Sequence, residues 1–204
     1  MQIAPRIQAA EWQKLKLDDH TSPDWITAVQ ILESRIHERY IEPIDRLITS
    51  EETLSASEHR FGFTVLAVDC LLIETLGAFL DGLEDTEGKS KTTFCRFLTT
   101  RPFLKGDFTE DLAQRFYKEF RCGILHQAEI GGKSKVWSVG PLIKDHGDNL
   151  IVNRNELHSK LKNEFQNYLA ELRDPTNVDL RAKFRTKMDH ISRSSNPKAR
   201  RSRT

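Results

Sequence analysis

The segment Phe61-Gly-Phe-Thr-Val-Leu-Ala-Val-Asp-Cys-Leu-Leu-Ile-Glu-Thr-Leu-Gly-Ala-Phe-Leu80 constrains the architecture more than any other part of this 204-residue chain. It is apolar on nearly every side of a helix axis, which is typical of a helix buried at the centre of a bundle. Too many polar groups interrupt it for a membrane span. We therefore expect a buried central helix between about His59 and Leu83.

The composition is that of a water-soluble globular protein, with 38% hydrophobic and 30% charged residues. The N-terminal residues lack the apolar core of a targeting signal. Cys70, Cys95 and Cys122 are an odd number of cysteines within expected helices. This pattern argues against a disulfide framework and favours a reducing, cytoplasmic location. We expect no membrane association.

The helical spacing of apolar residues predicts most of the remaining elements. Pro43 must break or kink the helix that begins near Asp24, and Gly131-Gly132 ends the helix that begins near Asp107. The turn-rich segment 145–149, flanked by short apolar runs, indicates a β-hairpin. The expected elements are one or two helices over 24–49, helices over 93–100, 107–129, 155–173 and 175–191, and a hairpin over about 135–153.

These elements predict a mainly α protein, a helical bundle with a small inserted β-hairpin. Residues 1–175 form a single bundle domain in this prediction. Residues 176–204 form a basic C-terminal helix and a disordered tail, which we expect from about Ser192 to Thr204.

Positive charge is concentrated at the C-terminal end. Nine lysines and arginines but only one acid lie between Arg181 and Thr204, whereas the whole chain has a net charge of +1. Such a segment is compatible with contact to a phosphate backbone. A solvated face, or a surface that docks on the acidic body, is the alternative. The candidate nucleic-acid contacts are Arg181, Lys183, Arg185 and Lys187.

The helix expected to end near Glu129 carries the candidate chemistry. It contains Phe120-Arg-Cys-Gly-Ile-Leu-His-Gln-Ala128, in which four residues separate Arg121 from His126. A histidine can transfer a proton near neutral pH, and an arginine can hold the charge that builds on a phosphate in a transition state. Together, the two side chains are the minimum needed to cleave RNA without a metal ion.

The apolar central helix with its embedded acid, followed by a helix with this Arg–His motif, resembles the HEPN superfamily (higher eukaryotes and prokaryotes nucleotide-binding), in particular its small bacterial members. The resemblance covers about residues 55–172. The motif of that family is an arginine, usually followed by a polar residue, and a histidine a few positions later. Here Cys122 stands at the position where the family commonly has asparagine, aspartate or histidine.

The resemblance implies a helical bundle that dimerises and brings two motifs together at a shared cleft. Active members are metal-independent ribonucleases, often in toxin–antitoxin or antiphage systems, and other members only bind nucleotides or act as scaffolds. The expected partners are a second copy of the chain, RNA as the substrate, and a cognate antitoxin or regulatory protein. We expect no cofactor and no metal. The chain is thus either a ribonuclease that uses attack by the 2′-hydroxyl, or a non-catalytic dimeric module that binds RNA, a nucleotide or a protein.

A regular helix does not bring the two catalytic candidates together. Five residues at about 100° each place Arg121 and His126 about 140° apart around the axis. A two-fold dimer removes this difficulty, because His126 of one chain can meet Arg121 of the other. Gly123 is small enough to permit close approach of the two chains at such an interface.

Four further residues are assigned supporting roles, and Glu74 is the best candidate for pairing with Arg121. A structural explanation of the motif is also open, with a buried Arg121 tied to Glu74 or Asp69 and His126 bonded to a carbonyl. A zinc site at Cys122 and His126 lacks further ligands close in sequence. The supporting residues are Glu74, Asp81, Cys122 and Gln127.

Overall fold

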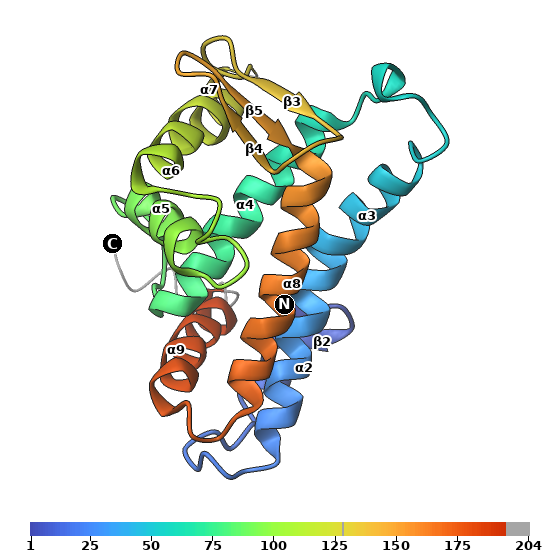
Figure 1. The fold of residues 1–204 in the computed structure, drawn as a ribbon. Coiled ribbons are helices and arrows are strands. Elements are labelled where there is room, and N and C mark those ends of the chain that lie inside the picture. The colour runs from blue at the N-terminus through green and yellow to red at the C-terminus, as the bar shows by residue number, and fades with distance from the viewer. Residues whose placement is uncertain (128, 195–204) are drawn as a thin grey trace, which may run out of the picture. The chain divides into compact units, whose positions relative to one another are not determined.

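The computed structural model describes residues 1–127 and 129–194, and within these residues the predicted mainly α class is confirmed (Figure 1). The part of the predicted tail beyond residue 194 lies outside the described residues. The backbone groups into two compact units, each assembled from separate stretches of sequence. The first comprises Met1–Arg39, Ala78–Thr86 and the described residues from Gln166 onward, and the second comprises Tyr40–Gly77 and Glu87–Phe165.

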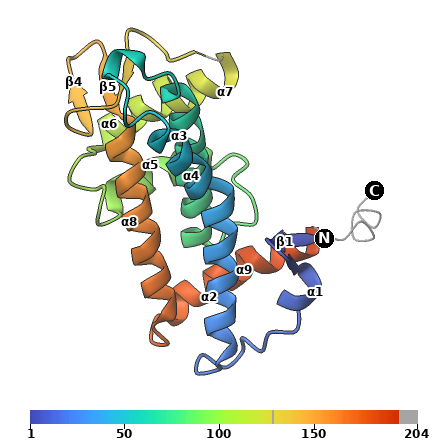
Figure 2. The same cartoon turned by 90° about the vertical axis from the view of Figure 1, so that its right-hand side faces the viewer.

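The first unit contains two main helices and an N-terminal β-ribbon. Its elements also include the C-terminal parts of two helices that begin in the second unit. Figure 2 shows the last helix, α9, passing beside α1 and β1. The elements are β1 (Gln2–Ala4), β2 (Ile7–Gln8), α1 (Ala9–Trp12), α2 (Asp24–Ile36), the end of α4 (Gly62–Asp81), the end of α8 (Arg154–Arg173) and α9 (Val178–Ser194).

Phe184 of α9 lies at the centre of the core of the first unit. Its ring is fully buried, and its centroid lies 5.7 Å from that of Trp12, 6.3 Å from that of Trp25 and 6.1 Å from that of Phe79. The indole nitrogen of Trp12 also donates a 2.7 Å hydrogen bond to Asp189 of α9. The basic C-terminal helix is therefore an integral part of this core.

The second unit is a helical body covered at one end by a small sheet. Pro43 lies in the first turn of α3, and a π-helical turn over His37–Ile41 joins α2 to α3. A proline cannot donate the backbone bond that a continuous α-helix requires, so the helix is locally rebuilt before it resumes. The helices of this unit are α3 (Glu42–Thr49), α4 up to Gly77, α5 (Ser90–Thr100), α6 (Glu110–Phe116), α7 (Gly123–Gln127) and α8 up to Phe165.

The predicted hairpin is part of a three-stranded sheet with the order β3-β5-β4. β4 (Ile143–Asp145) and β5 (Leu150–Asn153) form the antiparallel hairpin, whereas β3 (Lys135–Trp137) pairs with the other edge of β5 in parallel. The sequence prediction missed this third, parallel strand. Gly140, at φ 87°, lies in the loop that turns the chain between β3 and β4, and its carbonyl accepts a hydrogen bond from the side chain of Asn153.

Helix α4 is long and apolar enough to cross a membrane by length and composition alone, and no other described helix meets these criteria. However, 56% of its most apolar window is buried against the rest of the protein. Burial within the protein therefore accounts for part of the hydrophobicity of α4.

The packing of α9 predicts a large effect on stability when Phe184 is truncated. Phe184→Ala should lower the free energy of unfolding by about 3–5 kcal/mol, because it leaves a cavity among three other aromatic rings. Urea denaturation would measure this loss. Val178→Ala, at a half-exposed position of the same helix, is the matched control and should change the free energy of unfolding by less than about 0.5 kcal/mol. Equal stability of the two variants would contradict the described position of α9.

Candidate functional site

The helix that carries the Arg121–His126 motif is not regular. It starts as α6, where the hydroxyl of Thr109 accepts the backbone N–H of Leu112 at 3.2 Å, and it continues through a π-helical turn over Tyr117–Cys122 into α7. π-helical turns are rare and occur frequently at functional sites. Because Arg121 belongs to this turn and His126 follows it, regular α-helical spacing does not describe how the two side chains are oriented.

Arg121 is held by Glu74 of α4, as the sequence predicted for a supporting carboxylate. Its Nε and Nη2 donate to the same oxygen, Glu74 Oε2, at 3.1 and 2.7 Å. The two side chains are 15% and 12% exposed, and the Arg121 guanidinium lies 5.3 Å from the centre of the Tyr117 ring. Burial acts to lower the pKa of Arg121, but the hydrogen bonds and charge of Glu74 outweigh it, so the pKa is raised and the cation is secured.

His126 lies at the surface near the end of α7. Within the described part of the chain it makes no hydrogen bond and no ion pair, so the imidazole is accessible to a ligand. The alternative structural explanation, in which a carbonyl bonds this histidine, is therefore not met by any described residue. Gln127 is also exposed and ends α7, and Cys122 is a half-buried free thiol.

Gly123 has a different role from the one expected. It is buried within its own chain, and a Cβ at this position would lie 2.5 Å from the carbonyl oxygen of Glu129. The loop after α7 folds back here, where Gly131 N–H donates to the carbonyl of Glu119 at 2.7 Å. The glycine is thus required by the turn of its own chain, and the prediction that it permits close approach of a second chain is corrected.

Asp81, the other acid assigned to the site, is the last residue of α4 and belongs to the first unit. Glu74 lies in the second unit together with Arg121. The carboxylate that bonds to Arg121 is therefore Glu74, and Asp81 is not assigned to this pair.

Arg181, predicted to contact nucleic acid, is instead a structural residue of the first unit. It is 3% exposed, and its guanidinium donates to the backbone carbonyls of Leu172, Arg173 and His20. Leu172 and Arg173 end α8, where carbonyls have no partner within the helix. Burial lowers the pKa of Arg181. The prediction that Arg181 grips phosphates is corrected, since its donors cap a helix end inside the protein.

The other three predicted contacts on α9 are engaged by acceptors of the first unit. Lys183 lies 2.6 Å from Asp179, Arg185 lies 2.7 Å from Asp18, and Lys187 donates to the carbonyl of Glu84 at 2.7 Å. Lys183 and Arg185 keep 42% and 36% of their side-chain surface exposed. Arg193 of the same helix, which was not among the predicted contacts, keeps 71% of its side-chain surface exposed and is more accessible to a polyanion than either of them.

A row of charged side chains along α8 was missed by the sequence prediction. Arg154, His158 and Lys162 follow one another at steps of four, so they share one face of the helix. Arg154 pairs with Glu51, Nδ1 of His158 lies 2.8 Å from Oδ1 of Asp69, and Lys162 lies 2.7 Å from Asp45. The spacing of these basic residues was a usable signal, but their acidic partners lie far away in sequence.

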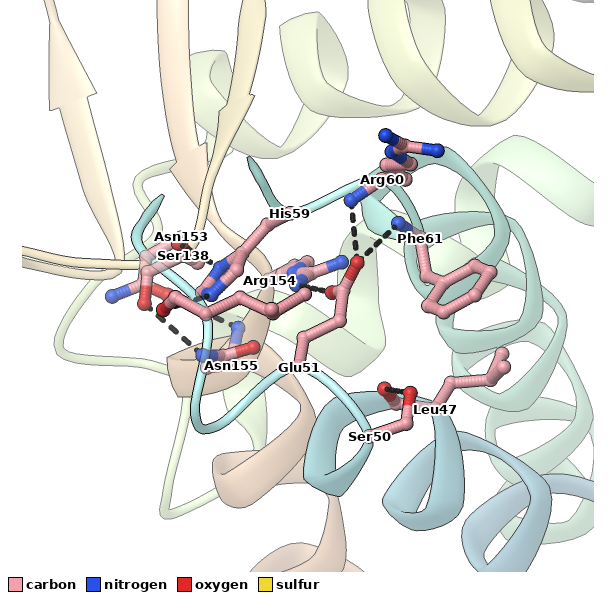
Figure 3. Close-up of polar contacts among 11 residues, drawn as sticks. Leu47, Ser50, Glu51, His59, Arg60, Phe61, Ser138, Asn153, Arg154 and Asn155 are labelled. Carbon is pink, nitrogen blue, oxygen red and sulfur yellow. Dashed lines mark hydrogen bonds and ion pairs between the residues drawn. The ribbon is translucent and has the colours of Figure 1, made fainter. Parts of the chain in front are cut away.

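Of the three acids that pair with this row of α8 residues, Glu51 accepts the most hydrogen bonds (Figure 3). One oxygen accepts the backbone N–H groups of Arg60 and Phe61, and the other accepts Nη2 of Arg154. Burial acts to raise the pKa of Glu51, but these three donors outweigh it and hold the pKa below its usual value. By contrast, burial raises the pKa of Asp69 more than its bond to His158 lowers it.

No group of three or more histidine, cysteine, aspartate or glutamate side chains is arranged to hold a metal ion in residues 1–127 and 129–194. Comparisons of the chain with protein-family models, with curated proteins and with solved structures find no match.

The pKa of Glu51 predicts how stability depends on pH. Because the folded-state pKa is lowered, ionised Glu51 stabilises the fold above its unfolded value near 4.5, and this contribution is lost as the pH falls through the folded-state pKa. Glu51→Gln should therefore cost about 3–5 kcal/mol at pH 7, since it leaves Arg154 buried without its counter-charge. The difference in the free energy of unfolding between wild type and Glu51→Gln, measured by urea denaturation, should become smaller as the pH is lowered. Glu52→Gln at the adjacent exposed position is the control, and a gap that does not depend on pH would contradict the assignment.

Proposed function

We propose that this chain is a HEPN-like, metal-independent endoribonuclease that acts as a homodimer. The observation that carries the proposal is the state of the two motif residues. His126 is exposed and makes no bond to a described residue, whereas Arg121 is a secured cation held by Glu74 within the same short segment. The motif thus supplies an accessible proton-transfer group and an anchored phosphate-binding group, the two components that metal-free RNA cleavage requires.

The proposed reaction is attack of a ribose 2′-hydroxyl on the adjacent phosphorus. The 2′-oxygen forms a bond to phosphorus, the bond from phosphorus to the 5′-oxygen breaks, and a 2′,3′-cyclic phosphate and a 5′-hydroxyl result. His126 of one subunit takes the proton of the 2′-hydroxyl, and His126 of the other gives a proton to the leaving oxygen. Arg121 holds the charge on the non-bridging oxygens. Its Nη1 makes no hydrogen bond to a described residue, so one end of the guanidinium fork remains for the phosphate.

The exposed surface of α4 supports the dimer. Phe63 and Leu71 are 37% and 41% exposed, and with the partly exposed Ala67 they form a stripe at steps of four that leads to Glu74. Leu125, the residue before His126, is 43% exposed. Large exposed apolar side chains that gather on one helix face are typical of interaction sites. We propose that this stripe, named the α4 stripe, packs against its copy and brings two motifs together.

A non-catalytic binding module is the second candidate, and one observation favours it. Both Nε and Nη2 of Arg121 are already occupied by Glu74, as in a purely structural ion pair. In this alternative the dimer binds RNA, a nucleotide or a protein such as a cognate antitoxin without cleaving. A role as a toxin or antiphage effector belongs to the ribonuclease proposal and would be tested by growth arrest on expression.

RNA cleavage in EDTA distinguishes the two candidates. Wild-type protein should cleave total RNA and leave cyclic phosphate ends, and His126→Ala should be slower by about 100-fold or more, because general acid–base catalysis is lost. His146→Ala is the matched control, since His146 is another exposed histidine of the second unit and should keep full activity. Arg121→Lys keeps the charge but loses the guanidinium fork, and should also be slower. Equal rates for wild type and His126→Ala would refute the ribonuclease, and RNA binding without cleavage would support the module.

The α4 stripe predicts the effect of a charge on assembly. Leu71→Glu should convert the dimer to a monomer, because two carboxylates would face each other across an apolar two-fold interface. Light scattering at micromolar concentration measures the mass, and loss of cleavage should accompany loss of the dimer. Ile26→Glu is the control, because Ile26 is also an exposed large apolar residue but belongs to the first unit. A wild-type monomer, or a dimer that survives Leu71→Glu, would contradict this interface.

A further inference from the structure

A cavity in the second unit, separate from the Arg121–His126 motif, holds an unusual buried cation. The cavity has a volume of about 300 Å³ and lies between the loop before α4, the end of β3 and the start of α8. Arg154 lines it and is 2% exposed, yet its Nη1 has no hydrogen-bond partner among the residues that the structure describes. A buried donor without an acceptor is costly, so its retention beside a cavity indicates that a ligand supplies the acceptor.

We propose that this cavity is a binding site for a small aromatic carboxylate, with Arg154 as the group that recognises the carboxylate. This proposal is independent of the proposed ribonuclease activity. It assigns a second site to the chain and names the class of ligand, a compact monoanion with a flat apolar body.

The carboxylate end of the ligand is specified by the charges around Arg154. Glu51 occupies Nη2 of Arg154 and cancels its charge, while the backbone N–H groups of Arg60 and Phe61 hold the other oxygen of Glu51 in place (Figure 3). Nη1 therefore offers a fixed donor in surroundings that are close to neutral. Such a site suits one oxygen of a monoanion better than a phosphate dianion, which Glu51 would repel.

Other polar groups that line the cavity are also held by hydrogen bonds within the chain. Nε2 of His59 lies 3.3 Å from the carbonyl of Leu54, which can only accept, so Nε2 carries the proton. Nδ1 of His59 lies 2.8 Å from Oγ of Ser138 and forms a hydrogen bond with it (Figure 3). Ser57 lines the same cavity, but Ser55 donates its hydroxyl hydrogen to Glu58, so Ser57 donates to Oγ of Ser55 at 3.0 Å and is not assigned to the ligand.

The apolar body of the ligand is specified by the opposite wall. Val136, Trp137 and Val139 line the cavity, and the indole of Trp137 offers a flat face for a second ring. Nζ of Lys144 lies 5.6 Å from the centre of the Trp137 ring and places a positive charge over that ring. A cavity of about 300 Å³ is at the lower end for small-molecule sites, so it admits one or two rings and excludes a polymer.

Benzoate is the probe for this site, with benzamide as its neutral isostere and phenyl phosphate as the dianion. Titration of each into the whole protein would be followed by the NMR signal of the Trp137 indole N–H, identified by its loss in Trp137→Phe. Benzoate should bind saturably with a dissociation constant of about 1 mM or below, at least about tenfold more tightly than benzamide or phenyl phosphate. Saturable binding of all three with equal affinity, tighter binding of phenyl phosphate, or no shift with benzoate would overturn the proposal.

Two pairs of variants locate the interaction. Glu51→Met with Arg154→Met replaces both members of the buried pair and avoids an uncompensated charge, and it should abolish benzoate binding. The same double replacement at Arg101 and Glu164, another pair involving α8 but outside the cavity, is the matched control and should leave binding unchanged. Unchanged binding in the first double variant would overturn the assignment of Arg154.

Val139 offers a test that does not disturb the core, because it is 54% exposed. Val139→Glu places a like charge at the cavity and should weaken benzoate binding by about two- to fivefold, whereas Val139→Gln, equal in size, should not. The comparison of these two variants tests whether the carboxylate binds in this cavity, even if the double variant at Glu51 and Arg154 fails to fold. Equal affinity of the two variants for benzoate would show that the carboxylate binds elsewhere.

Discussion

The fold of the second unit depends on one constraint, which is that the acids of an almost wholly apolar helix must be neutralised. Asp69 and Glu74 belong to α4, and an unpaired buried carboxylate is expensive. Each is met by a cationic or titratable partner from a different element, Asp69 by His158 of α8 and Glu74 by Arg121 of the π-helical turn. The two acids thus specify which elements neighbour α4, because hydrophobic burial alone does not distinguish one apolar helix face from another.

The same constraint bears on the proposed chemistry. Arg121 is at once the partner that Glu74 requires and the candidate phosphate-binding group, so its structural and functional roles are joined in one side chain. An arginine fixed in this way needs little reorganisation when a phosphate arrives, which is a general advantage of preorganised charge. The cost is that Glu74 occupies two of its donors. Among the described residues, His126 has no hydrogen-bond or ion-pair partner, so of the two motif residues only Arg121 is fixed by another side chain.

Local sequence patterns were sufficient to predict much of the fold. The apolar run 61–80 and the breaking effect of Pro43 correspond to element boundaries in the structure, whereas α7 ends at Gln127, before the predicted end at Gly131-Gly132. The parallel strand β3 could not be predicted, because its pairing with β5 depends on residues far apart in the chain. Arg181 was misassigned for a similar reason. Its positive charge is visible in the sequence, but the carbonyls that it caps become neighbours only on folding.

The candidate sites show the same limit. The pairing of Arg121 with Glu74 was anticipated, because Glu74 is an acid embedded in the apolar central helix. The orphaned Nη1 of Arg154 was not, since the cavity beside it is assembled from three separated segments and has no signature in any one of them.

The interleaved units have a consequence for how such a chain can diversify. Each unit is assembled from segments that are separated in the sequence. Both α4 and α8 begin in the second unit and end in the first. Neither unit is a continuous polypeptide, so recombination cannot exchange one while it keeps the other. Change is then confined to substitution and to length variation in surface connections, such as the loops around the small sheet. The two units are therefore expected to evolve together.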